Sequence, residues 1–341
     1  KYIKKKLPNC AKKAKAAIIL GIAQIFFSKV PSYAAVNSTV NLFVGKISGW
    51  RRLANAVLRK INQDKDKLQS LKKNMIYSVP SWIYKDWLKQ FGKQKTLKML
   101  KVYQHEPPLD IRVKEKINLW VQELEGVKIG SSTVRVFNKG KIENLKGYEK
   151  GHWWIQDFAA QLPVISMGNI KGKNILDLCA SPGGKTLQML NAGAIVTSID
   201  ISKERAKQLH ANIKRVGLTK NFKMEVCDIM KFSPSIKPDI VLLDTPCTGT
   251  GTFRKNPDVL WIKNKKDVIY NADNQKKLLQ KALNFINKDG ILIYSNCSLQ
   301  YEEGEDIIQE LCKKKIILVD KITYKEISGY PEEIINKGLI R

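Results

Sequence analysis

The second half of the sequence alternates between short apolar runs and longer segments of helical length, which limits the folds it can adopt. The short runs are rich in β-branched residues, as is typical of buried strands. Strands that alternate with helices form a parallel sheet with helices on both faces. From Gln156 onward we therefore expect an α/β domain. Its expected strands are residues 175–179, 195–200, 222–227, 240–244, 291–295 and 316–320, and its expected helices are residues 185–191, 203–216, 273–286 and 303–314.

Two cysteines each follow one of these expected strands at its carboxyl end. Cys247 lies three residues after Asp244, and Cys297 lies two residues after Ser295. Open α/β sheets gather their chemistry at that edge, so the two thiols can face one crevice. Free cysteines are more often small buried hydrophobes, and that interpretation stays open for the pair taken alone. A third strand-turn-helix unit, residues 174–186, favours a functional site, because its adjacent glycines let a nucleotide approach the backbone amides of a helix start.

Three acidic residues also end expected strands, namely Asp200, Asp228 and Asp244. A single aspartate there is usually a turn or helix-cap residue, and Asp200, which precedes Ile201 and Ser202, fits that explanation alone. Three such acids in one sheet favour ligand binding. A dehydrogenase would share the pattern, but the sequence lacks a G-x-G-x-x-G turn and the two thiols have no role in hydride transfer. The fold alone does not decide the function.

The chain is strongly basic, with 60 Lys and Arg residues against 31 Asp and Glu residues and a net charge of +29. This excess favours an anionic polymer as partner. A lysine-rich composition also follows from an AT-rich genome, in which case much of the charge is solvated surface. Basic clusters close to Trp or Tyr favour nucleic acid, because aromatic rings stack on bases. These clusters are Arg51-Arg52, Lys72-Lys73, Lys263-Asn-Lys265-Lys266 and Lys313-Lys-Lys315. Charge alone does not choose between RNA, DNA and an anionic membrane.

The six cysteines form no CxxC pair and no zinc-type spacing, so we expect no metal site and a reducing, cytoplasmic compartment. The basic N-terminus, the apolar residues 16–27 and the small residues around Ala35 together imitate a secretory leader. Ile18, Ile22 and Phe26 follow helical spacing, which favours an amphipathic core helix instead. No apolar stretch reaches transmembrane length.

The first half of the sequence predicts helices, followed by a small mixed segment. We expect helices over residues 7–27, after the Pro31-Ser32 turn and over residues 50–61. A further helix over residues 82–91 has Ser81 as its candidate N-cap and Gly92 at its end. Pro107-Pro108 marks a boundary, beyond which strand-like residues 109–113 and 133–137 surround a helix at residues 115–124. Residues 147–151 then lead into the α/β domain.

Three segments of the α/β domain resemble motifs of the Nol/Nop/Sun family of RNA cytosine-5 methyltransferases. Asn174–Thr186, Asp244–Gly251 and Ser295–Ser298 resemble the patterns LDxCAAPGGKT, DAPCSGxG and TCS of that family. The front of the chain resembles the bacterial RsmB (Sun) branch, which methylates 16S rRNA and has a NusB-like N-terminal domain. The matching segments there are Val30–Asn37, Asn55–Lys60, Tyr77–Trp82 and Gly151–Leu162.

This resemblance implies a domain order and a fold. Residues 1–65 would be an all-helical NusB-like RNA-binding domain, and residues 66–150 linker helices and a small α+β RNA-binding subdomain. Residues 151–341 would be a Rossmann-like domain that depends on S-adenosylmethionine (SAM). Compared with the family, both ends of the sequence look truncated, and the last stretch of the relatives supplies an antiparallel strand.

The resemblance also implies roles for individual residues. The SAM cradle would consist of Cys179, Ala180, Ser181, Pro182, Gly183, Gly184 and Lys185, with Asp200 at the ribose, Asp228 at the adenine amino group and Asp244 beside them. Carbon 5 of cytosine is a poor nucleophile, and a thiolate that adds to carbon 6 activates it. By this resemblance, Cys297 would be that nucleophile, and Cys247 would assist the release of Cys297 after methyl transfer. Asp244 would hydrogen-bond or protonate the base at N3. Ser181, Thr245 and Asn296 replace family residues with small polar ones, so we expect retained activity, while Gly304 in place of the usual Asn would loosen a helix start.

The preferred interpretation is a monomeric enzyme that methylates carbon 5 of one cytosine in 16S rRNA, with no membrane or DNA partner. The same chemistry on tRNA or another RNA stays open, because the motifs do not name the substrate. An RNA-binding assembly factor with weak or no catalysis is the alternative from a different class. Such a factor would need neither SAM nor Cys297.

Overall fold

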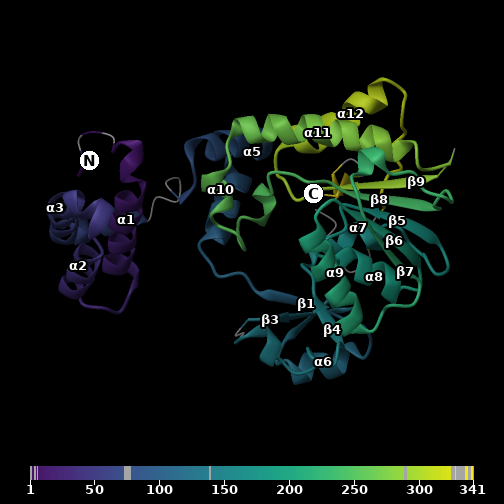
Figure 1. Cartoon of the computed structure of the whole chain (residues 1–341), viewed down its shortest axis with the longest axis horizontal. Helices are drawn as coiled ribbons and strands as arrows, with labels where there is room; N and C mark the ends of the chain where they lie inside the picture. Colours follow the sequence, from purple (N-terminus) through teal and green to yellow (C-terminus); the bar gives the residue numbers. More distant parts are fainter. Residues whose placement is uncertain are drawn as a thin grey trace. The chain divides into compact units, whose positions relative to one another are not determined.

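A computed structural model describes residues 2–3, 5, 7–72, 78–137, 140–287, 290–323, 327, 335–336 and 339–340. The chain forms two compact units, residues 1–78 and residues 79–341 (Figure 1). Lys73 and Tyr77, which belong to segments singled out in the sequence, lie outside the described residues. No helix among the described residues is long and apolar enough to cross a membrane.

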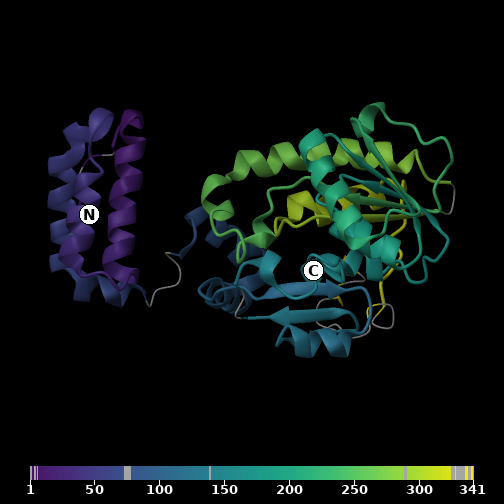
Figure 2. The same cartoon turned by 60° about the horizontal axis from the view of Figure 1, so that its bottom comes forward.

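The first unit is helical, as the sequence predicts. Its elements are η1 (Asn9–Ala11), α1 (Lys12–Phe27), α2 (Ser32–Asn41), η2 (Gly45–Trp50), α3 (Arg51–Gln63) and α4 (Lys65–Lys72). The helices α1, α2 and α3 lie side by side (Figure 2) around buried Ile18, Ile25 and Leu58. A Cβ atom at Gly21 would lie 2.7 Å from Oγ1 of Thr39, so a glycine is needed where α1 crosses α2.

The second unit opens with α5 (Ser81–Tyr103), which Gly92 divides. Gly92 has φ 72°, a backbone conformation that glycine adopts without strain, and it ends the first half as predicted. The helical second half was not expected from the sequence. The prediction of Ser81 as N-cap was wrong: Pro80 is the cap, its carbonyl accepts a hydrogen bond from the Tyr84 amide at 3.1 Å, and Ser81 is already helical.

A four-stranded antiparallel sheet with the order β2-β3-β1-β4 follows α5. Its elements are β1 (Leu109–Val113), α6 (Ile117–Glu123), β2 (Val127–Ile129), β3 (Thr133–Val136) and β4 (Trp153–Ile155). The two predicted strands and the helix are confirmed. The strands β2 and β4 were not predicted, because three residues are too few to show an alternating pattern. Asp110 of β1 is buried and pairs with Arg135 of β3, with Nε to Oδ1 at 2.7 Å.

The α/β domain contains a five-stranded parallel sheet with the order β7-β6-β5-β8-β9. The strands are β5 (Asn174–Leu178), β6 (Ile195–Asp200), β7 (Phe222–Val226), β8 (Ile240–Asp244) and β9 (Ile291–Ser295). The helices are α7 (Leu162–Ile165), α8 (Gly184–Asn191), α9 (Lys203–Val216), α10 (Val259–Ile262), α11 (Lys265–Leu283) and α12 (Glu305–Lys313). The shorter elements are η4 (Ile142–Asn144), η5 (Ala159–Gln161), η6 (Ile229–Lys231), η7 (Thr250–Thr252), η8 (Tyr301–Glu303), β10 (Ile335–Asn336) and β11 (Leu339–Ile340).

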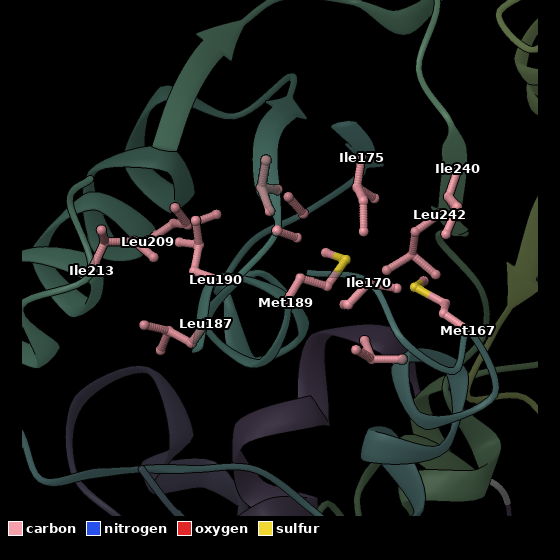
Figure 3. Close-up of a cluster of buried hydrophobic side chains, with 14 of the residues drawn as sticks. Met167, Ile170, Ile175, Leu187, Met189, Leu190, Leu209, Ile213, Ile240 and Leu242 are labelled. Carbon is pink, nitrogen blue, oxygen red and sulfur yellow. The ribbon is translucent and has the colours of Figure 1, made fainter. Parts of the chain in front are cut away.

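Successive strand residues pack against helices on opposite faces of this sheet, because side chains alternate along a strand. Ile175 and Leu242 face α8 and α9, where Met189 and Leu209 lie in the same cluster (Figure 3). The neighbouring Leu176 and Val241 belong to a second cluster with residues of α11 and α12. The predicted doubly covered parallel sheet is therefore confirmed, and it is a Rossmann-like fold.

Two predictions for this domain were wrong. Residues 316–320 form no strand, and within the described part of the chain β9 is the last strand of the sheet on that side. Ile316 and Leu318 are exposed, Leu318 by 96%, whereas Ile317 is half-buried against the core without forming a strand. The helix predicted from residue 273 begins at Lys265, because Asn264 and Asp267 form a capping box that stabilises an earlier start.

Candidate active site

The strands β8 and β9 bring the two cysteine segments together at the carboxyl edge of the sheet. Asp244 and Ser295, the last residues of the two strands, are paired in the parallel register. The amide of Thr245 donates to the Ser295 carbonyl at 2.8 Å and carries the pairing one residue further. Beyond this point the Sγ atoms of Cys247 and Cys297 lie 3.3 Å apart. The structure therefore brings together two thiols that are fifty residues apart in the sequence.

The environment gives the two thiols opposite tendencies to ionise. The hydrogen bond from Cys247 lowers the pKa of Cys297, burial raises it, and the charges of Asp244 and Lys185 act in opposite directions on it. The same hydrogen bond, together with burial, raises the pKa of Cys247 well above its usual range. Cys297 is exposed, whereas Cys247 is half-buried. Cys297 is therefore the thiol of the pair that ionises more readily, and its thiolate would accept a hydrogen bond from the Cys247 thiol.

Asp244 and Lys185 form an ion pair beside the thiols. The Lys185 Nζ lies 2.7 Å from Oδ2 of Asp244, and the Ser295 hydroxyl donates to Oδ1 at 2.5 Å. Burial lowers the pKa of Lys185, but the carboxylates of Asp244 and Asp177 more than offset this and raise it. The pair therefore offers both a fixed acceptor and a positive charge next to Cys297.

The glycine turn between β5 and α8 forms a tight loop at the same edge of the sheet. Gly183 has φ 101°, and a Cβ atom there would lie 2.8 Å from Leu209, so only glycine fits. Cys179 begins the loop, and burial raises its pKa to about 12, which keeps it a thiol. Ser181 Oγ is buried without a hydrogen-bond partner among the described residues, as is Oδ1 of Asp177. Buried polar atoms are normally paired, so these two oxygens mark places for a polar ligand.

The other two strand-end acids also lie at this edge. Asp200 is buried, and its two carboxylate oxygens accept the amides of Ser181 at 3.1 Å and Ser202 at 2.9 Å. Asp200 is thus a turn residue, through its bond with Ser202, and its bond with Ser181 also fixes the glycine loop. Asp228 is half-buried and accepts the Met230 amide at 2.9 Å with Oδ1. Both residues therefore have a structural bond and keep acceptor capacity for a ligand.

Sequence reasoning missed two acidic residues of this region. Burial raises the pKa of Asp177 to about 7, and its Oδ2 accepts the Thr186 hydroxyl at 2.6 Å. The sequence feature that could have identified Asp177 is an aspartate inside an otherwise apolar strand. Glu303 has no exposed surface and binds both cysteine segments. It had no signal, because it stands in an acidic run that reads as solvated surface.

Two family models match parts of the chain. Residues 165–331 match the family model described as 16S rRNA methyltransferase RsmB/F, and residues 1–63 match that of the NusB family. The ribosomal RNA small subunit methyltransferase B of Escherichia fergusonii is 29% identical over 309 residues, which cover 84% of this chain and 70% of that protein. The protein of the same name from Photorhabdus laumondii is 28% identical over 313 residues, which cover 87% of this chain and 73% of that protein.

A solved structure shares the fold. NSun6 from Pyrococcus horikoshii superposes with a TM-score of 0.63 at 21% sequence identity, covering 73% of this chain and 90% of that protein. At this identity the likeness concerns the fold. The family models and the relatives carry the assignment further. The matching family models and the relatives indicate a SAM-dependent rRNA methyltransferase of the RsmB/F type, with a region similar to the NusB family at its N-terminal end.

Proposed function

We propose that this protein methylates carbon 5 of one cytosine in 16S rRNA, through a covalent bond between Cys297 and carbon 6 of the base. The observation that carries the proposal is the thiol pair, in which the Sγ atoms of Cys247 and Cys297 lie 3.3 Å apart, with the pKa lowered at Cys297 and raised at Cys247. A methyltransferase that acts on a nitrogen or oxygen atom needs no such nucleophile. Methylation at carbon 5 needs one, because the ring carbon must first be activated.

The cofactor would lie along the glycine loop, and the residues there fit it. SAM supplies the methyl group. The loop of residues 179–185 would hold its amino acid end, where Ser181 Oγ and Asp177 Oδ1 are buried oxygens available for its polar groups. Asp200 would accept hydrogen bonds from the ribose hydroxyls, and Asp228 would accept one from the adenine amino group. Both residues lie at or just after the carboxyl ends of strands at this edge of the sheet. Asp244 borders the same space through its ion pair with Lys185.

The residues around Cys297 would activate the base. The Cys297 thiolate forms a bond to carbon 6, and the electron pair of the ring double bond moves to carbon 5, which accepts the methyl group. Asp244, held by its ion pair with Lys185, would hydrogen-bond or protonate the base at N3. Water would then take the proton from carbon 5, the electron pair of that C–H bond would restore the double bond between carbons 5 and 6, and Cys297 would leave carbon 6 as a thiolate. The neighbouring Cys247 thiol would stabilise that leaving thiolate by its hydrogen bond. The target base must leave its stack to enter this site.

The helical unit would contribute RNA binding through a basic groove. A groove of about 440 Å³ is lined by Asn37, Val40, Asn41, Arg51, Arg52, Asn55 and Arg59. It lies between α2 and α3 and contains three arginines and three asparagines with no acidic residue in its lining. Arginine side chains bind phosphate oxygens with two parallel hydrogen bonds, and amides bind phosphate or base edges. These groups suit an RNA backbone.

Removing the groove arginines is expected to weaken RNA binding without changing the catalytic site. In Arg51→Ala/Arg52→Ala/Arg59→Ala, the slope of log affinity against log salt should fall by about 2, since each lost phosphate contact lowers it by about 0.7 to 0.9. Lys12→Ala/Lys13→Ala/Lys15→Ala removes equal charge from exposed positions of α1 outside the groove and serves as the matched control. Filter binding to 16S rRNA fragments at several salt concentrations measures both. Equal losses in the two triple variants would contradict a specific groove.

The proposed reaction is tested by following single cytosines. The full chain is incubated with SAM and with unmodified 16S rRNA, partly assembled small subunits or tRNA, and each RNA is then sequenced after bisulfite treatment. We expect one newly protected cytosine in 16S rRNA. Protection of a tRNA cytosine instead would keep the chemistry and change the substrate. SAM binding without transfer to any of these RNAs would contradict the proposal and favour an assembly role.

A further inference from the structure

Glu303 connects the two cysteine segments directly. It ends η8, just before α12, and its side chain has no exposed surface. Its Oε1 accepts the amide of Thr248 at 2.7 Å, and its Oε2 accepts the hydroxyls of Thr248 and of Ser298, the latter at 2.5 Å. Thr248 directly follows Cys247, and Ser298 directly follows Cys297. One carboxylate therefore holds the residue next to each thiol.

The backbone of Glu303 is itself held by the end of β9. Its carbonyl accepts the Asn296 side-chain amide at 2.8 Å and the Tyr294 hydroxyl at 3.0 Å. Asn296 in turn accepts the amide of Ser298 at 2.8 Å. Glu303 is thus fixed at both its backbone and its side chain, so it can hold the two segments rather than follow them. A long-range link of this kind is needed, because side chains at the tips of two loops have no ladder hydrogen bonds to set their distance.

A second link shows how closely the segments must approach. The amide of Gly251 donates to the Cys297 carbonyl at 2.8 Å, and a Cβ atom at Gly251 would lie 2.7 Å from that oxygen. The separation of the two thiols therefore depends on contacts on both sides of Cys297. Among the described residues that form hydrogen bonds with Thr248 and Ser298, Glu303 contributes the one charged side chain.

The charge of Glu303 also acts on the Cys247 thiol. Burial raises the pKa of Glu303, and hydrogen bonds from Ser298 and Thr248 oppose that shift because they favour the carboxylate. In turn, the negative charge of Glu303 adds to the causes that raise the pKa of Cys247, after the hydrogen bond to Cys297 and burial. The other charged or titratable groups around the thiol pair and Glu303 are Lys185, Asp244, Tyr294 and Glu302.

We propose that Glu303 is a positioning residue that holds the Cys247 and Cys297 segments together, so that the two thiols stay within hydrogen-bond distance of each other. It acts through Thr248 and Ser298, and it contacts no substrate because it is fully buried. The proposal rests on the proposed function in one respect only, namely that the Cys297 thiolate attacks a base. The difference in reactivity between the Cys247 and Cys297 thiols is a property of the free protein and is measured without RNA.

The test is the alkylation of the two cysteines by iodoacetamide over a range of pH, in the full chain. Mass spectrometry of the peptides that contain Cys247 and Cys297 gives a separate rate for each. In the wild type, Cys297 should react faster and at lower pH than Cys247. Glu303→Gln keeps the size of the side chain but removes its charge and presents an NH₂ group to two hydroxyl donors. We expect the ratio of the Cys297 rate to the Cys247 rate to fall about tenfold, and the pH midpoint of Cys297 alkylation to rise by about one unit, which is the same factor expressed on the pH scale.

Two variants separate this role from a general loss of structure. Glu302→Gln removes a neighbouring carboxylate that binds Lys265 and not the cysteine segments, so the rate ratio should not change. Glu303→Asp keeps the charge and should restore part of the ratio. Thermal unfolding shows whether each variant is folded. A folded Glu303→Gln with the wild-type rate ratio and pH midpoint would overturn the proposal. If Glu303→Gln instead fails to fold, Glu303→Asp decides. A wild-type rate ratio in Glu303→Asp, despite its shorter side chain, would likewise contradict the positioning role of Glu303.

The result is independent of the proposed reaction. Loss of the ratio in Glu303→Gln would support the role of Glu303 even if no RNA were methylated at carbon 5. An unchanged ratio in a protein that does methylate cytosine would reject this inference and leave the function intact. Where methylation is measurable, Glu303→Gln should lower kcat with little change in KM for RNA, because the residue does not touch the RNA.

Discussion

Cys297→Ala is expected to abolish methyl transfer, with a loss of at least about 1,000-fold, because a nucleophile that forms a covalent bond has no substitute in the site. The neighbouring Cys247 does not replace it, since its pKa is raised well above the usual range and its side chain is less exposed. The measurement is the initial rate of label transfer from SAM to the RNA that the bisulfite experiment identifies.

The variant should keep its cofactor site and its fold. The loop of residues 179–185 lies between β5 and α8, and the contacts of Glu303 with Thr248 and Ser298 do not involve the Cys297 thiol. Binding of SAM should therefore match that of the wild type. Cys10→Ala makes the same chemical change at an exposed cysteine of the helical unit and should leave the rate unchanged. Full transfer by Cys297→Ala, with loss in Cys247→Ala, would require the two roles to be exchanged.

The sequence predicted the parts of the fold that repeat a local pattern. The five parallel strands could be predicted because buried strands such as Ile240–Asp244 are short, apolar and flanked by turn residues. The meeting of Cys247 and Cys297 followed from the same rule, since parallel strands end at one edge. The predicted strand at residues 316–320 failed because an apolar pattern does not show whether a neighbouring strand is there to pair with it.

The electrostatic features of the site could not be predicted in this way. The opposite shifts in the pKa values of Cys247 and Cys297 depend on one distance of 3.3 Å between residues far apart in the sequence. Glu303 looks like a solvated acid in the run Glu302-Glu303-Gly304-Glu305, yet the fold buries it completely. Gly304, expected to loosen a helix start, is the N-cap position of α12, and its carbonyl accepts the amide of Ile307 at 3.1 Å. Only tertiary structure decides such cases.

Cys247→Ala is expected to trap a covalent complex between the protein and its RNA. Cys297 keeps its own access to the base, so the bond between sulfur and carbon 6 still forms. Its breakage is slowed, because the Cys247 thiol that would stabilise the departing thiolate across 3.3 Å is gone. A species that migrates slowly on denaturing gels and disappears after ribonuclease treatment measures this complex.

The trapped complex should also depend on pH in a defined direction. The hydrogen bond from Cys247 is the largest cause of the lowered pKa of Cys297, so its removal returns that pKa toward the ordinary value of a thiol. A larger share of Cys297 is then protonated at neutral pH, and the complex should form faster as the pH is raised. The double variant Cys247→Ala/Cys297→Ala should form no complex at any pH. A complex that persists in the double variant would place the bond on another residue, and its absence from the single variant would show that Cys247 has no part in release.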